Sequence, residues 1–175
     1  FFTTKDKTLL WLFQNFGKFL PNLAVPMFVN QIREDTKTVV IKGEDEPFNK
    51  HLKMRKEEGT RVNINLIGEV VLGEVEAAER MEKYLKALAN PNIDYISIKI
   101  STIFSQIIAL DFEHTVEVLV EKLSEIKKKK KKYPYISPNG TKSNKFINLD
   151  MEEYRDLAIT VEVFKRTLEK PEFKD

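Results

Sequence analysis

The chain has 175 residues, and its 29 lysines and arginines nearly balance its 27 aspartates and glutamates, leaving a formal net charge of +2. Overall charge therefore gives no argument for a nucleic-acid or membrane partner, and any basic surface must be local. The sequence has no cysteine, which excludes disulfides, zinc–thiolate sites and thiol catalysis and is compatible with a reducing cytosol. Its apolar stretches fall well short of the roughly 20 residues that a membrane-spanning helix needs.

Residues 1–59 read as helices and form a predicted N-terminal helical arm. Leucine and phenylalanine recur at three- and four-residue spacing over residues 9–20, and Pro21 is expected to end this first helix. A shorter helix is expected after Pro26, and a third over residues 47–59. We interpret the apolar stripe of the first helix as a packing face.

From residue 60 onward, the sequence predicts a strand followed by an amphipathic helix, three times over. The strands are expected at residues 61–67, 94–101 and 145–150, where apolar and polar side chains alternate. Strands that alternate with helices imply right-handed crossovers and a parallel sheet. The apolar faces of the three helices are expected to be Ala78, Met81, Leu85 and Leu88; Val116, Leu119, Val120, Leu123 and Ile126; and Leu157, Val161, Phe164 and Leu168.

The alternation within the strands separates two parallel-sheet architectures. Central strands of an open doubly wound sheet are apolar on both faces, whereas each strand here has one apolar and one largely polar face. No glycine-rich turn follows the first strand, which argues against a Rossmann dinucleotide site. We therefore predict an α/β fold in which residues 60–175 form part of a (βα)8 TIM-type barrel, namely its first three strand–helix units, after the arm at residues 1–59.

Charged residues are predicted on the polar face at the carboxyl ends of the three strands. Periodicity places Glu69, Lys99 and Asp150 there. Barrel enzymes carry their active sites at this end of the strands, so three charges of mixed sign favour an active-site rim. The alternative is a buried Lys99–Asp150 ion pair that only fixes the strand register.

A lysine between two carboxylates allows two kinds of chemistry. Lys99 could form a Schiff base with a carbonyl substrate, but nearby carboxylates stabilise the ammonium form and raise the pKa of a lysine. The cluster could instead recognise a zwitterion, with Asp150 facing its cationic end.

The six consecutive lysines from Lys127 to Lys132 are the strongest local basic signal. They could bind nucleic acid or an acidic membrane, but we favour a solvated helix end and linker, because cations complement the helix dipole there. The run precedes a strand, so we expect it at the end of the barrel opposite the strand carboxyl ends. Residues 134–144 are expected to form a loop. His51 and His114 lack metal-ligand spacing, so no metal site is predicted.

Three segments together resemble a known family. They are RVNINLIGEVVLG at residues 61–73, YISIKIS at 95–101 and KFINLDMEEYRDL at 145–157. These segments are similar to the first half of the proline dehydrogenase domain of bifunctional proline utilization A proteins. The order IGE, SIK and NLDMEE at these spacings is specific, and the resemblance covers most of the chain.

The resemblance implies a flavoenzyme. In this family an eight-stranded barrel binds FAD, and L-proline is oxidised to 1-pyrroline-5-carboxylate by hydride transfer to the flavin N5 atom. By motif, Lys99 resembles a catalytic substrate-pocket residue, and Asp150 resembles a catalytic residue beside the proline and the flavin. Met151 resembles a position that touches the flavin, and Glu69 resembles the residue that ion-pairs with a pocket arginine.

The same resemblance implies partners and a location. It implies L-proline as substrate, a quinone electron acceptor, a fused aldehyde dehydrogenase domain and a homo-oligomer, with no nucleic-acid partner. It also implies a cytoplasmic protein with peripheral contact at the inner membrane.

The chain departs from the family pattern after residue 171. The family continues with a strand carrying a flavin-contacting glutamine, an Arg-Val-Lys-Gly segment and paired arginines for the proline carboxylate, and none of these follows here. An eight-stranded barrel needs at least about 200 residues, so we expect a fragment that is inactive alone. The remaining alternatives are a lysine-dependent barrel aldolase and a non-enzymatic basic binding module that uses Lys127 to Lys132.

Overall fold

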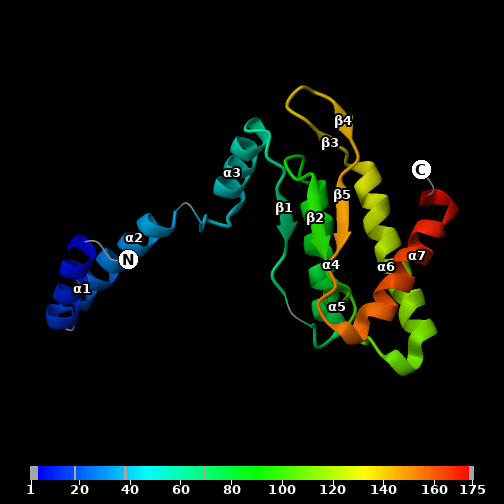
Figure 1. Cartoon of the computed structure of the whole chain (residues 1–175), viewed down its shortest axis with the longest axis horizontal. Coiled ribbons are helices and arrows are strands. Elements are labelled where there is room, and N and C mark those ends of the chain that lie inside the picture. The colour runs from blue at the N-terminus through cyan, green and yellow to red at the C-terminus, as the bar shows by residue number, and fades with distance from the viewer. Residues whose placement is uncertain (1–3, 18, 38, 69, 174–175) are drawn as a thin grey trace. The chain divides into compact units, whose positions relative to one another are not determined.

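The structure is a computed structural model that describes residues 4–17, 19–37, 39–68 and 70–173. The chain divides into two compact units, residues 1–48 and residues 49–175 (Figure 1). The predicted boundary between residues 59 and 60 stays a prediction.

The described residues of the first unit include two complete helices, α1 (Thr4–Phe16) and α2 (Pro21–Thr36). Pro21 occupies the first turn of α2, where the missing N–H of a proline costs no helical hydrogen bond. The helix then continues through Pro26. The expectation that a helix starts only after Pro26 is therefore wrong.

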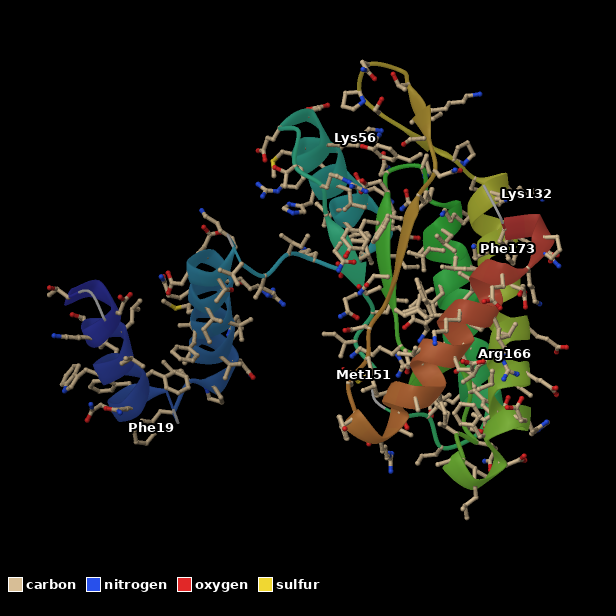
Figure 2. The ribbon with its side chains drawn as sticks, turned by 45° about the vertical axis from the view of Figure 1, so that its right-hand side comes forward. Phe19, Lys56, Lys132, Met151, Arg166 and Phe173 are labelled. Carbon is tan, nitrogen blue, oxygen red and sulfur yellow. The ribbon has the colours of Figure 1, made fainter. Side chains whose placement is uncertain are left out.

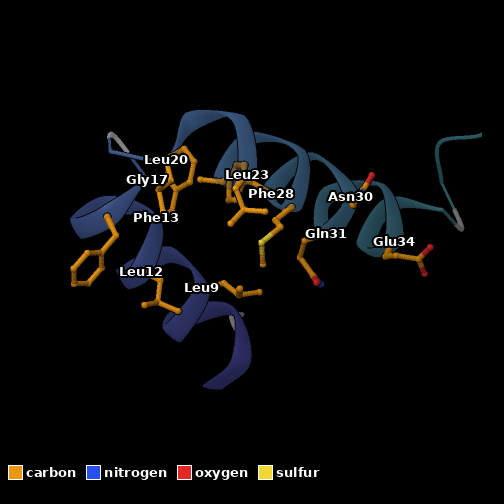
Figure 3. A pocket seen from close by; sticks show the side chains of 13 residues that line it. Leu9, Leu12, Phe13, Gly17, Leu20, Leu23, Phe28, Asn30, Gln31 and Glu34 are labelled. Carbon is orange, nitrogen blue, oxygen red and sulfur yellow. The ribbon is translucent and has the colours of Figure 1, made fainter.

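An apolar groove of about 520 Å³ lies between α1 and α2 (Figure 3). The rings of Phe13 and Phe28 stack there, with 5.0 Å between their centroids. The predicted packing stripe of α1 is only partly covered, since Phe16 remains 54% exposed and Leu20 60% exposed. The groove is lined mainly by leucine, phenylalanine and methionine, so it offers a contact surface rather than reactive groups.

The second unit is built on a parallel three-stranded sheet. Its strands are β1 (Asn63–Asn65), β2 (Tyr95–Ile98) and β5 (Phe146–Leu149), with β2 in the centre. This confirms the predicted α/β class and the parallel sheet. The strands are shorter than expected. Strand β2 ends early because the backbone turns directly into the short helix α5 (Ile100–Ile103). Among the described residues, strand β1 has a hydrogen-bonded neighbour on one side only.

Helices connect and cover these strands (Figure 1). Gly73 and Asn90 flank α4 (Glu74–Ala89), close to the predicted limits. Gly59 adopts a positive φ of 74° two residues beyond the end of α3 (Asp45–Glu57). In the described residues, a short 3-10 helix precedes α6, another precedes α7, and a third follows α7. The bounds are α3 (Asp45–Glu57), α4 (Glu74–Ala89), α6 (Phe112–Lys132), α7 (Leu157–Glu169), η1 (Ala109–Asp111), η2 (Tyr154–Asp156) and η3 (Pro171–Phe173).

One face of the sheet forms the core of the second unit. The side chains of Ile96 and Ile98 are fully buried beneath the apolar faces of α4 and α6. In α4 the buried face includes Tyr84, whose hydroxyl lies 3.1 Å from Thr102 Oγ1. Leu85, which the periodicity placed on this face, lies outside the buried core. The opposite face of the sheet is polar and more open.

Helix α7, which packs against α6, buries an unexpected face. The stripe predicted to pack, from Leu157 to Leu168, points outward, and Phe164 in its middle is 51% exposed. The buried face of α7 instead carries Ile159 and Val163 with two threonines. The threonines can be buried because each hydroxyl donates a hydrogen bond to the carbonyl four residues earlier.

The lysine run forms the last turns of α6, in agreement with the expected helix end. It lies at the end of the sheet opposite Met151, as expected from its place in the chain (Figure 2). The expected loop that follows contains an antiparallel hairpin of β3 (Tyr135–Ile136) and β4 (Lys142–Ser143). Gly140 provides the positive φ of 83° that its turn requires.

None of the helices in the described part of the chain is long and apolar enough to cross a membrane.

Candidate active site

A row of polar side chains crosses the open face of the sheet. Ser97, on the central strand, is only 2% exposed, and its Oγ lies 2.9 Å from Asn63 Nδ2 and 3.3 Å from Asn148 Nδ2. The two amides donate to the serine oxygen from β1 and from β5. Because buried polar groups need partners, this row fixes the register of all three strands.

A second, charged row lies one step further along the strands, where β2 and β5 end. Ile98 pairs with Leu149 in the parallel register, so Lys99 and Asp150 follow as neighbours. The Asp150 amide donates to the Ile98 carbonyl at 2.8 Å, which anchors the residue beside β2. The two predicted charges are therefore brought together at the carboxyl edge of the sheet.

Lys99 is tied to a residue that the periodicity argument did not select. Its Nζ lies 2.6 Å from Glu152 Oε1, and the Gly68 carbonyl oxygen is 3.5 Å away. The Lys99 side chain is only 12% exposed, whereas that of Glu152 is 45% exposed. Glu152 thus meets the lysine from the solvent side of the edge.

Asp150 has a different partner. Its Oδ2 accepts a hydrogen bond from Asn65 Nδ2 at 3.0 Å. Among the described residues, no lysine, arginine or histidine nitrogen forms an ion pair with it. The alternative of a direct Lys99–Asp150 ion pair is therefore not what the structure shows.

The electrostatics of this edge favour a charged lysine. The hydrogen bond to Glu152 raises the pKa of Lys99 above its ordinary value, against the opposing effect of burial, and the negative charges of Glu152 and Asp150 raise it further. Lys99 is thus an ammonium ion at neutral pH. An ammonium has no lone pair, so it cannot attack a carbonyl.

The two other predicted site residues are Met151 and Glu69. Met151 follows Asp150 at the carboxyl end of β5 and is 41% exposed (Figure 2). Its thioether is thus available for contact with a ligand at this edge. Glu69 lies outside the described residues, so its predicted role stays a prediction.

Sequence reasoning missed the partners of the charged residues. Glu152 lies two positions after Asp150, so the alternation that selected Asp150 could have selected it as well. Asn65 lies on the polar face of β1, but no pattern in the sequence shows that its amide reaches across the sheet to Asp150. These contacts depend on how the chain continues after each strand ends.

A buried lysine at the other end of the sheet does not belong to this cluster. Lys145 is 1% exposed, and its Nζ donates a hydrogen bond to the carbonyl of Asn90, just after α4. Burial lowers the pKa of Lys145 to about 8, with Asp94 acting in the opposite direction and Lys56 adding to the decrease. Lys145, which precedes β5, thus provides a hydrogen-bond donor to the backbone at the carboxyl end of α4.

In the described part of the chain, no three histidine, aspartate or glutamate side chains are grouped to hold a metal ion. The side chains that could meet an organic cofactor are Asp150 and Met151, which lie side by side at the open edge.

The fold and the charged edge define an α/β protein that gathers a lysine and two carboxylates at the carboxyl ends of parallel strands. Residues 48–175 match the family model of proline dehydrogenase. The chain therefore belongs to the proline dehydrogenase family.

Solved structures of proline utilization A (PutA) proteins are similar to this chain. The protein from Corynebacterium freiburgense is 33% identical with a TM-score of 0.68, and the match covers 92% of this chain and 16% of that one. The Bdellovibrio bacteriovorus protein, whose structure was solved after inactivation by N-propargylglycine, is 26% identical with a TM-score of 0.59, covering 75% of this chain and 15% of that one. The Bradyrhizobium japonicum protein shares the fold, at 21% identity and a TM-score of 0.53, covering 70% and 13%.

The chain thus spans about one sixth of the length of the first of these structures. A comparison with curated proteins found no match.

Proposed function

We propose that this chain is part of an FAD-dependent proline dehydrogenase, which oxidises L-proline to 1-pyrroline-5-carboxylate by hydride transfer to the flavin. The observation that carries the proposal is the charged edge of the sheet. In a chain of this family, Lys99 and Asp150 lie at the carboxyl ends of adjacent strands but have separate partners.

The charges at this edge suit an amino-acid substrate. Proline is a zwitterion at neutral pH, with a cationic ring nitrogen and a carboxylate. Asp150 would face the ring nitrogen, since a carboxylate is an acceptor for a cationic N–H. Lys99 would provide a fixed positive charge in the substrate pocket. Glu69 is proposed to bind substrate indirectly, through an ion pair with a pocket arginine.

The same edge suits a flavin. Met151 offers an exposed, polarisable thioether to an aromatic ring system, and the neighbouring Asp150 offers a hydrogen-bond acceptor. We propose that these two residues contact FAD, which when bound supplies the two-electron acceptor that no side chain can provide. The residues of this chain would orient the substrate and balance its charge.

We also propose that the sheet is the first part of a TIM-type barrel, with residues 1–59 as an arm and residues 60–175 as the first three strand–helix units. Two features support this. The sheet is apolar on its covered face and polar on the other, as expected of a barrel wall with a polar lumen. The outward stripe of α7, centred on Phe164, has the spacing of a face that packs against another helix.

Other implications of the resemblance stay proposals. They are a quinone as electron acceptor, a fused aldehyde dehydrogenase domain, a homo-oligomer, and a cytoplasmic location with peripheral membrane contact. The expectation that this piece is inactive alone is of the same kind.

The two alternative functions have less support. A Schiff-base aldolase needs a neutral lysine, whereas the carboxylates around Lys99 raise its pKa. A binding module based on the lysine run needs accessible ammonium groups, but Lys131 Nζ donates to the Glu172 carbonyl at 2.6 Å and Lys127 Nζ lies 4.3 Å from the centre of the Phe173 ring. Part of the lysine run thus contacts η3 of the same chain, at Glu172 and Phe173.

The test is the activity of the intact protein that contains this chain. The purified protein should be yellow, show a flavin absorption spectrum and reduce an electron-accepting dye when L-proline is added. D-proline serves as the control, because a chiral charged edge should discriminate between the two. A colourless protein that L-proline does not turn over would refute the proposal.

A further inference from the structure

Among the described residues, the carboxylates of Glu152 and Asp150 both act on Lys99, and the lysine forms its ion pair with Glu152. The strand register makes Asp150 its cross-strand neighbour, and opposite charges at such positions normally attract each other. The ammonium nevertheless lies 2.6 Å from Glu152, two residues further along the chain. The pairing therefore needs a cause outside the strand register.

The path of the chain after β5 supplies that cause. Residues 150–153 have no regular structure before η2 begins at Tyr154, and this segment carries Glu152 back toward the end of β2. Asp150 is held separately: its backbone N–H donates a hydrogen bond to the Ile98 carbonyl, and its side chain accepts one from Asn65. Each charged group thus has its own fixed partner.

We propose that Glu152 is a positioning residue: by binding Lys99 it keeps this ammonium away from Asp150, so that Asp150, oriented by Asn65, can receive the cationic nitrogen of an amino-acid substrate. The pairing rests on the geometry of this chain, and the substrate class rests on the proposed function.

Removing the charge of Glu152 should redirect Lys99. In Glu152→Gln the side chain keeps its size but loses its charge, so among the described residues the carboxylate that still attracts the ammonium is that of Asp150. An ammonium at Asp150 would compete with the substrate nitrogen. The expected result is a rise of roughly fivefold to tenfold in the KM for L-proline with a smaller change in kcat.

The chain offers a matched control in the next residue. Glu153 pairs with Arg155, with 2.7 Å between Glu153 Oε2 and Arg155 Nε, and it is not among the groups that shift the pKa of Lys99. Glu153→Gln removes the same charge one position away and should leave the KM for L-proline unchanged. Glu152→Asp keeps the charge on a side chain one methylene shorter and should keep KM within about threefold of the wild-type value.

A structural measurement tests the pairing without any assay of activity. In crystal structures of the intact protein, Lys99 Nζ should lie within about 4 Å of the Asp150 carboxylate in Glu152→Gln but not in Glu153→Gln. If Lys99 stays away from Asp150 in Glu152→Gln, the positioning role is wrong, whatever the protein oxidises. If the wild-type protein does not oxidise proline, the proposed function fails, and this measurement still decides the pairing.

The kinetic outcomes are equally decisive for proteins that do turn over proline. An unchanged KM in Glu152→Gln, or an equal rise in Glu153→Gln, would overturn the inference. Should Glu152→Gln not fold, Glu152→Asp still tests it: a KM raised well beyond threefold would contradict a role that depends on the charge.

Discussion

Lys99 Nζ lies 2.6 Å from Glu152 Oε1, and neighbouring Asp150 accepts its hydrogen bond from Asn65 instead. Two opposite charges at the ends of adjacent strands thus avoid neutralising each other. The lysine is a cation paired with Glu152, and the aspartate keeps carboxylate oxygens that can accept hydrogen bonds from a cationic group.

The charge state of Lys99 gives the first prediction. Because its carboxylate neighbours raise the pKa of Lys99, the residue should not form a Schiff base at neutral pH. Borohydride treatment with a carbonyl compound should leave the peptide containing Lys99 without a covalent adduct, as measured by mass spectrometry. An adduct on Lys99 that Lys99→Arg abolishes would favour the aldolase alternative.

Replacement of Asp150 gives the second prediction. Asp150→Ala in the intact protein should lower the rate of L-proline oxidation by about 100-fold or more, the scale seen when a group that stabilises reacting charge is removed. Thermal unfolding should change little, because Asp150 is only partly buried and its side chain has one hydrogen bond among the described residues. Glu153→Ala is the control, and near-normal turnover in Asp150→Ala would remove Asp150 from the proposed mechanism.

The third prediction concerns the polar row on the open face. Ser97→Ala leaves the amides of Asn63 and Asn148 without their shared acceptor, and because water can reach these amides, the free energy of unfolding should fall by about 1 kcal/mol. Urea unfolding of the intact protein measures this loss. Ser143→Ala, at an exposed position in β4, should have almost no effect. Equal stability of the two variants would show that the row does not hold the strands together.

Periodicity predicted much of the fold from local patterns. Alternation identified β2 and β5 and the face that carries Ser97, because each of those side chains has to point either into the core or away from it. It failed on α7, where two patterns overlap: Leu157 and Phe164 form the more apolar stripe, yet the less apolar stripe with Ile159 faces the core. Which stripe is buried depends on neighbouring elements that a single helix does not encode.

The candidate site was predictable in its charges but not in its contacts. Lys99 and Asp150 were found because strand ends and face assignments follow from alternation. Glu152 and Asn65 were missed as partners because the turn after β5 and the reach of an amide across the sheet are tertiary features. Residue types at strand ends are thus easier to predict than the pairs they form.

The fourth prediction uses the buried Lys145. Burial lowers its pKa to about 8, below the ordinary value of 10.5 that it has in the unfolded chain. Between these values the unfolded state binds more protons, so the contribution of Lys145 to stability should increase as the pH rises from about 8 toward 10.5. The free energy of unfolding of the wild type, relative to Lys145→Met, should rise across this interval.

Urea unfolding at several pH values measures this difference. Lys142→Met, on an exposed part of the neighbouring hairpin, should keep the wild-type dependence on pH. Parallel curves for the wild type and Lys145→Met would show that Lys145 keeps an ordinary pKa in the folded protein.

The most direct test of the central claim is an anaerobic titration of the intact protein with L-proline, followed by the visible absorption of the flavin. We expect the flavin band to bleach as proline is added, with 1-pyrroline-5-carboxylate formed in equal amount, and to persist with D-proline. A protein without a flavin band, or a band that L-proline leaves unchanged, would contradict the account.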